Sequence, residues 1–131
     1  MEMKLELVPV PVTDVDRAKA FYTDQLGFVL DVDVQPSEAM RVVQLTPPGS
    51  ACSIVIGTGL EAISDMTPGS IKGLHLVVND IAQARENLIG NGVDVSDISD
   101  VGGGVKYAWF SDPDGNSLTL QEMAWRTGAS F

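Results

Sequence analysis

The stretch that decides the fold is V-T-D-V-D-R-A-K-A-F-Y, residues 12–22, which follows the apolar pattern L-E-L-V-P-V-P-V of residues 5–12. The apolar residues before Val12 predict a strand, and its two prolines favour a position at a sheet edge. Thr13 or Asp14 is a suitable N-cap, and Gly27 is placed to end the helix that follows. One face of that helix is apolar and consists of Val15, Ala18, Phe21, Tyr22 and Leu26.

The same strand and helix pattern returns in the second half of the chain. Asp80 and Ile81 align with Asp14 and Val15, and G-N-G-V at residues 90–93 closes the second helix. The strand before it carries Leu74, Leu76 and Val78, and its helix carries Ile81, Ala84, Leu88 and Ile89. An internal repeat of this kind predicts two copies of one structural unit.

Each predicted helix is followed by three short strand candidates, with turn sequences at residues 47–49 and 112–115. The candidates are residues 28–34, 40–46, 53–57, 95–98, 105–110 and 117–122. The predicted fold class is α+β, with two tandem β-α-β-β-β modules that form a curved mixed sheet around a cavity. We expect one domain over residues 1–131, with module one at about 1–58, a linker at about 58–70, module two at about 71–124 and a C-terminal tail at 125–131.

The amino-acid composition limits the classes of partner and location that we expect. The chain has 131 residues, 44% of them hydrophobic, and a formal net charge of −10. A negative field of this size disfavours nucleic acid as a partner. The single cysteine, Cys52, excludes an internal disulfide and is best explained as a small apolar side chain. No apolar run suits a signal or a membrane span, so we expect a cytoplasmic protein without a membrane partner.

Several motifs together resemble the vicinal oxygen chelate (VOC) superfamily, of the glyoxalase, bleomycin resistance protein and dioxygenase type. They are residues 12–22, Leu26-Gly27-Phe28, Val78-Asn79-Asp80-Ile81 and F-S-D-P-D-G-N at residues 110–116, and they span nearly the whole chain. The resemblance implies paired β-α-β-β-β modules around a cavity and commonly a homodimer. A small organic molecule is then the expected partner.

The resemblance also implies a divalent metal ion held by His and Glu side chains on the concave strands. The corresponding positions in this chain are Leu7, Gly73, Thr119 and one residue within 53–57, which read S-I-V-I-G. Leucine and glycine side chains cannot coordinate a metal, and a threonine hydroxyl is a poor substitute for a carboxylate. We therefore predict no metal site and no cofactor, although the fold assignment rests on other residues.

Strand alternation indicates which side chains face the predicted trough. If Leu118 and Leu120 belong to the core, Thr119 and Gln121 face the trough, and Glu122 points away from it. Arg41 could bind an anionic group there, although a surface arginine is the more frequent role. The predicted ligand-binding residues are Leu7, Pro9, Arg41, Gly73, His75, Tyr107, Trp109, Thr119 and Gln121.

His75 is the only histidine. It could act as a general base or a ligand partner, and a packed histidine is the simpler alternative. The favoured hypothesis is a metal-independent protein that binds and sequesters a largely apolar or aromatic molecule. The alternatives are a VOC-type lyase, isomerase or dioxygenase, with His75 as base or with a metal held by His75, Gln121 and Glu122, and a structural dimer without a working site. Enzymatic activity is thus left open.

Overall fold

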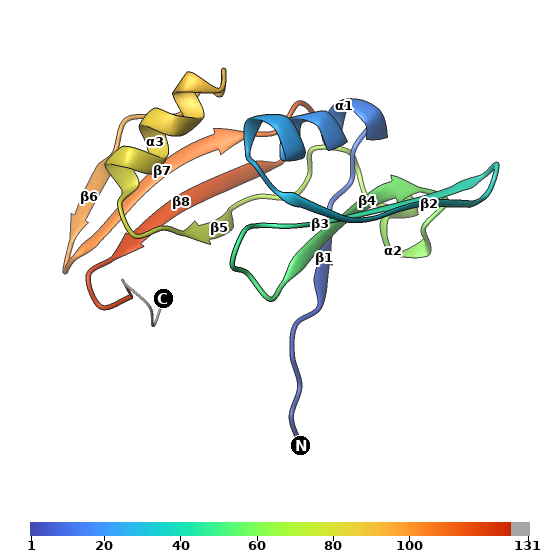
Figure 1. Cartoon of the computed structure of the whole chain (residues 1–131), viewed down its shortest axis with the longest axis horizontal. Helices are drawn as coiled ribbons and strands as arrows, with labels where there is room; N and C mark the ends of the chain where they lie inside the picture. The colour runs from blue at the N-terminus through green and yellow to red at the C-terminus, as the bar shows by residue number, and fades with distance from the viewer. Residues whose placement is uncertain (127–131) are drawn as a thin grey trace. The chain divides into compact units, whose positions relative to one another are not determined.

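The computed structural model describes residues 1–126, so most of the predicted tail, residues 127–131, lies outside the described part. The chain forms two compact units, each with one four-stranded sheet (Figure 1). The first unit consists of Met1–Ile71 together with Asp112–Asn116. The second consists of Lys72–Ser111 and the chain from Ser117 onward. The short segment 112–116 therefore belongs with the first unit, although it connects two strands of the second.

The first unit has the predicted order of strand, helix and three strands. The first sheet has the order β1-β4-β3-β2, with β1 parallel to β4 and the other pairs antiparallel. Its elements are β1 (Leu7–Pro9), α1 (Val15–Ala20), the π-helical turn η1 (Phe21–Gln25), β2 (Val29–Ser37), β3 (Met40–Thr46), β4 (Ser53–Thr58) and α2 (Glu61–Ser64). The edge position predicted for the proline-containing strand is confirmed, and α2 lies within the predicted linker.

Helix α1 begins where the sequence predicts, and the π-helical turn η1 continues it to Gln25, two residues before the predicted end at Gly27. The Asp14 side chain accepts a hydrogen bond from the Arg17 backbone amide, which satisfies a free donor of the first turn. Gly27 has a φ of +76° after the helix, a conformation that favours glycine. The buried face of the helix and the facing strands form the core of this unit, with Val15, Ala18, Phe21, Tyr22, Val43, Leu45, Ile54 and Ile56.

The second unit repeats this topology. The second sheet has the order β5-β8-β7-β6, with β5 parallel to β8. Its elements are β5 (Leu74–Val77), α3 (Ile81–Gly90), β6 (Ser99–Gly102), β7 (Val105–Ser111) and β8 (Ser117–Met123). Asp80 caps α3 by accepting from the Gln83 amide. Figure 1 shows α3 lying along β7 and β8, over a core of Ile81, Ala108, Phe110, Leu118 and Leu120.

The α+β class with two tandem β-α-β-β-β modules is confirmed, and two strand predictions need correction. The strand predicted at residues 95–98 is wrong, because the strand there is β6 at Ser99–Gly102. The Ser96 hydroxyl accepts from the Trp109 amide, so a side chain takes a donor that a paired strand would use. Strand β1 is shorter than predicted, since Pro9 and Pro11 lack backbone donors. Among residues 1–126, no helix is long and apolar enough to cross a membrane.

Candidate functional site

Strand pairing in the second unit brings six of its side chains onto one face of the sheet. Thr119 of β8 lies between His75 of β5 and Trp109 of β7, which forms one row across the strands. The next row has Gln121 between Val77 and Tyr107. Directly paired residues point to the same side of a sheet. We call this surface the aromatic face, and define it by His75, Val77, Tyr107, Trp109, Thr119 and Gln121.

The opposite face of the same sheet is covered by α3 and carries the charges of these strands. Lys106 is paired with Asp100 on one side and with Glu122 on the other. Glu122 Oε1 accepts a hydrogen bond of 2.9 Å from the Ile81 amide at the start of α3. As predicted, Glu122 points away from the side of Thr119 and Gln121. By this alternation, strands β5 to β8 place no aspartate, glutamate, lysine or arginine on the aromatic face.

The rings on the aromatic face contact one another. Tyr107 and Trp109 are stacked, with ring centroids 6.3 Å apart and an interplanar angle of 29°. His75 meets Tyr107 edge to face, with centroids 5.9 Å apart. The Gln121 side-chain amide donates a hydrogen bond of 3.3 Å to the Tyr107 hydroxyl. Trp109 is 45% exposed and Thr119 only 2%, so the ring is open to a ligand while the hydroxyl lies low between its neighbours.

A short contact to the backbone fixes the His75 ring. Nδ1 lies 2.6 Å from the Gly73 carbonyl oxygen, which can only accept, so Nδ1 carries the hydrogen. In the neutral ring, Nε2 is then a hydrogen-bond acceptor. Gly73 has a φ of +74°, which favours glycine, and a Cβ there would lie 3.6 Å from the imidazole ring. Gly73 thus positions His75, a role that the sequence did not reveal.

Leu7 and Pro9 lie in the first sheet, on the face away from α1. Leu7 is paired with Ser53, and Pro9 with Val55. The Ser53 hydroxyl is 2.6 Å from that of Thr46 on the neighbouring strand. This face therefore combines apolar side chains with hydroxyl groups and the Gln44 amide, which donates to the Glu6 carboxylate at 3.3 Å. Because Leu7 and Pro9 belong to the other unit, their place in one site with the aromatic face stays a prediction.

Arg41 lies on the opposite side of the first sheet, facing α1. It alternates with Val42 along β3 and shares a face with the core residue Val43. Its guanidinium is 2.7 Å from Asp16 of α1 and 3.0 Å from Asp33 of β2. Lys19 of α1 also contacts Asp33, at 2.7 Å. Within the first unit, Arg41 therefore lies on the opposite face of the sheet from Leu7 and Pro9.

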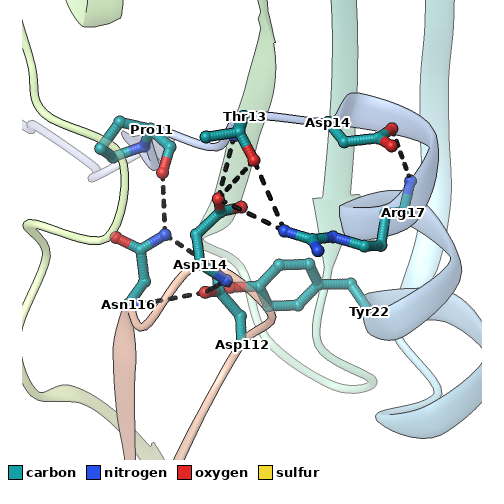
Figure 2. A network of polar contacts seen from close by, with 8 residues as sticks. All are labelled: Pro11, Thr13, Asp14, Arg17, Tyr22, Asp112, Asp114 and Asn116. Atoms are coloured by element: carbon teal, nitrogen blue, oxygen red, sulfur yellow. Dashed lines mark hydrogen bonds and ion pairs between the residues drawn. The ribbon is translucent and has the colours of Figure 1, made fainter.

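The loop at residues 112–116 is held in the first unit by a buried polar network (Figure 2). The Tyr22 hydroxyl donates a 2.9 Å hydrogen bond to Asp112, and the Asn116 amide donates to both Asp112 and the Pro11 carbonyl, each at 2.8 Å. Asp114 accepts from the Thr13 hydroxyl at 2.6 Å. Both Asp112 oxygens are already used, Oδ1 by the backbone amides of Asp114 and Asn116, which supports the predicted turn.

The residues present do not fit the divalent ion that the resemblance implies. Leu7 and Gly73 offer no ligand atom, and Thr119 lies low between His75 and Trp109. Within residues 53–57 the one side-chain oxygen is that of Ser53, which bonds to Thr46. Over residues 1–126, no group of three or more His, Cys, Asp or Glu side chains is placed to hold a metal ion.

The fold and the motifs define a class of protein. The model of the Glyoxalase/Bleomycin resistance protein/Dioxygenase superfamily matches residues 4–120, and the chain belongs to this superfamily. The resemblance drawn from the repeat and the loops is thereby confirmed.

Three solved structures of this superfamily or of similar fold resemble this chain. TnmS3, an antibiotic binding protein from Streptomyces sp. CB03234, is 34% identical with a TM-score of 0.81, and the match covers 94% of this chain and 98% of TnmS3. A glyoxalase/bleomycin resistance protein from the same organism is 36% identical with a TM-score of 0.75, over 89% and 98% of the two chains. A superfamily member from Sphaerobacter thermophilus DSM 20745 is 31% identical with a TM-score of 0.79, over 92% and 98%. The comparison with curated proteins gave no match.

Proposed function

We propose that the protein binds a small, largely apolar or aromatic organic molecule on the aromatic face, without a metal ion, and sequesters it. The observation that carries this proposal is the stacking of the exposed Trp109 on the partly buried Tyr107, beside the uncharged polar groups of Thr119 and Gln121. Ligand sites of proteins combine such apolar and aromatic surface with a few placed hydrogen-bonding groups. Aromatic side chains favour flat ligands because ring faces and edges attract one another.

The comparisons support the proposal at a coarser level. The chain belongs to a superfamily that includes bleomycin resistance proteins, and TnmS3 is described as an antibiotic binding protein.

We further propose that Leu7 and Pro9 contribute apolar contacts to the ligand. A homodimer and a cytoplasmic location complete the proposal. The dimer is tested by light scattering after size-exclusion chromatography, in which the measured molar mass should be about twice that of one chain.

Binding is tested with a set of aromatic compounds in thermal shift and titration calorimetry. We expect saturable binding without turnover, and the same affinity after treatment with EDTA, because no metal takes part. Trp109→Ala will weaken binding about tenfold, the value of one lost ring contact. Trp125→Ala is the matched control, because Trp125 is exposed after β8 and lies outside the aromatic face.

Two outcomes would contradict this proposal. One is a stoichiometric divalent ion in protein purified without chelator, with binding lost when the ion is removed. The other is equal loss of affinity in Trp109→Ala and Trp125→Ala, which would show that the stacked pair is not the binding surface.

A second candidate function is catalysis with His75 as general base. The observation that favours it is the Nδ1 contact to Gly73, which leaves Nε2 of the neutral ring free to accept a proton on the aromatic face. If a substrate is found, His75→Ala will abolish turnover while circular dichroism and the melting temperature stay close to those of the unchanged protein. Turnover that survives in His75→Ala would exclude this role and leave binding alone.

A further inference from the structure

We infer that the ligand is a planar aromatic cation, a fused-ring compound with a protonated amino group. This inference rests on the proposed function and names the chemistry that the aromatic face selects. It follows from three features of the second unit: where its charges lie, which hydrogen-bonding atoms remain available, and how its rings are exposed.

The charges of the second sheet are segregated. Asp100, Lys106 and Glu122 all lie on the α3 face, as shown by their pairing across the strands. A carboxylate or phosphate bound on the aromatic face would find no lysine or arginine side chain of these strands on that face. Removing such an anion from water without a partner is strongly unfavourable. The face therefore selects against anionic ligands.

Two acceptor atoms remain available on the aromatic face, beside the hydroxyl groups of Tyr107 and Thr119, which can donate or accept. The Gln121 side chain uses its amide nitrogen to donate to Tyr107, which leaves Oε1 as an acceptor with no hydrogen-bond partner among residues 1–126. His75 uses Nδ1 to donate to Gly73, which leaves Nε2 of the neutral ring as an acceptor. Acceptors of this kind match a ligand that presents N–H groups, as an aromatic amine does.

The rings and the net charge act in the same direction. Trp109 and Tyr107 present π-systems that attract a cation placed over them, most strongly for tryptophan. The whole chain has 18 acidic and 8 basic side chains, so its field draws cations toward the surface. A planar cation can stack on the exposed Trp109 ring and donate to the neighbouring acceptors at once.

Three tricyclic compounds of equal ring size test the inference. They are 9-aminoacridine, which is a cation at neutral pH, neutral acridone, and the anion acridine-9-carboxylate. Titration calorimetry at low salt should give the tightest binding for the cation, by about tenfold over acridone and more over the anion, from cation–π attraction and field together. Added salt should reduce the preference, because it screens the field.

A pair of variants separates local selection from net charge. Gln121→Lys puts a cation on the aromatic face and should weaken 9-aminoacridine binding about tenfold, by like-charge repulsion and loss of the acceptor. Glu86→Gln changes the net charge by the same amount on the exposed surface of α3 and should leave the affinity within about twofold. Equal effects of the two variants would overturn the inference.

The outcomes distinguish this inference from the proposed function. Acridone or the carboxylate binding as tightly as the cation, and still depending on Trp109, would overturn the cationic preference and leave the binding function standing. No binding by any of the three would overturn both.

Discussion

The two units have the same strand order, yet the sheet faces that point away from α1 and α3 differ. Counted from the ends of β3 and β7, Gln44 corresponds to Trp109 and Val42 to Tyr107. One copy of the repeat thus has an amide and an aliphatic side chain where the other has two stacked rings. The repeated residues, mainly caps and core positions, determine the scaffold. The residues that break the repeat identify the candidate site.

The helices of the two units differ as well. In the first unit, Phe21 and Tyr22 are buried, whereas Ile89 at the end of α3 is 45% exposed. Tyr22 corresponds in the repeat to Leu88, which has no hydroxyl group. In the first unit this position carries a polar anchor that holds the 112–116 loop, so its core depends on a hydrogen-bond network as well as on apolar packing (Figure 2).

Asp112→Ala should lower the free energy of unfolding more than any other substitution proposed here, because it removes the group that holds the 112–116 loop in the first unit. The buried Asp112 carboxylate accepts from Tyr22, from the Asn116 side chain and from two backbone amides. Its removal leaves these donors without a partner, so we expect a loss of about 3–5 kcal/mol in the free energy of unfolding. Urea denaturation followed by circular dichroism measures this loss.

The corresponding hairpin loop of the first sheet supplies the control. Ser50 lies between β3 and β4 in an exposed turn, and within residues 1–126 its hydroxyl bonds only to the backbone of Cys52. Ser50→Ala should therefore cost less than about 0.5 kcal/mol. Similar losses for Ser50→Ala and Asp112→Ala would show that the 112–116 loop is an ordinary turn and not an anchor.

Tyr22→Phe tests the same hydrogen-bond network through the pH dependence of the free energy of unfolding. Burial, and next the negative charge of Asp112, raise the pKa of the Tyr22 hydroxyl above its usual range. Because the pKa is higher in the folded state, the stabilisation is fully present below the pKa of a free tyrosine, about 10. It is lost as the pH rises above that value. At neutral pH the variant should lose about 1.5 kcal/mol, the value of one hydrogen bond to a charged group.

The dependence of the unfolding free energy on pH at alkaline pH identifies the cause of that loss. Between about pH 10 and 11.5, the unfolding free energy of the unchanged protein should fall more steeply than that of Tyr22→Phe, because only the former must keep a buried phenol neutral. Parallel slopes for the two proteins would exclude Tyr22 as the titrating group and leave only its packing.

Much of the scaffold and part of the site could be predicted from the sequence. Asp14 and Asp80 mark helix starts by local chemistry, and strict alternation placed Tyr107, Trp109, Thr119 and Gln121 on one side. The bond from Tyr22 to Asp112 joins positions 90 residues apart, and no local pattern reveals it. The side of the sheet that Arg41 occupies could have been found from Val43, because residues two apart on a strand share a face.

Asp33→Asn gives the smallest effect and compares the ion pairs of the two units. Hydrogen bonds from Arg41 and then from Lys19 hold the pKa of the Asp33 carboxyl well below its usual range. This stabilisation is present above about pH 3.9, the value of a free aspartate, and is lost as the pH falls toward the lowered pKa. At neutral pH we expect a loss of about 1 kcal/mol, because the partly exposed carboxylate serves two cations. In the second unit, the Asp97 carboxylate that pairs with Arg85 is fully exposed to solvent, so Asp97→Asn should leave the urea midpoint unchanged. If Asp97→Asn destabilises the protein as much as Asp33→Asn, the bridge from α1 to the first sheet has no special strength, and the two units hold their helices by apolar packing alike.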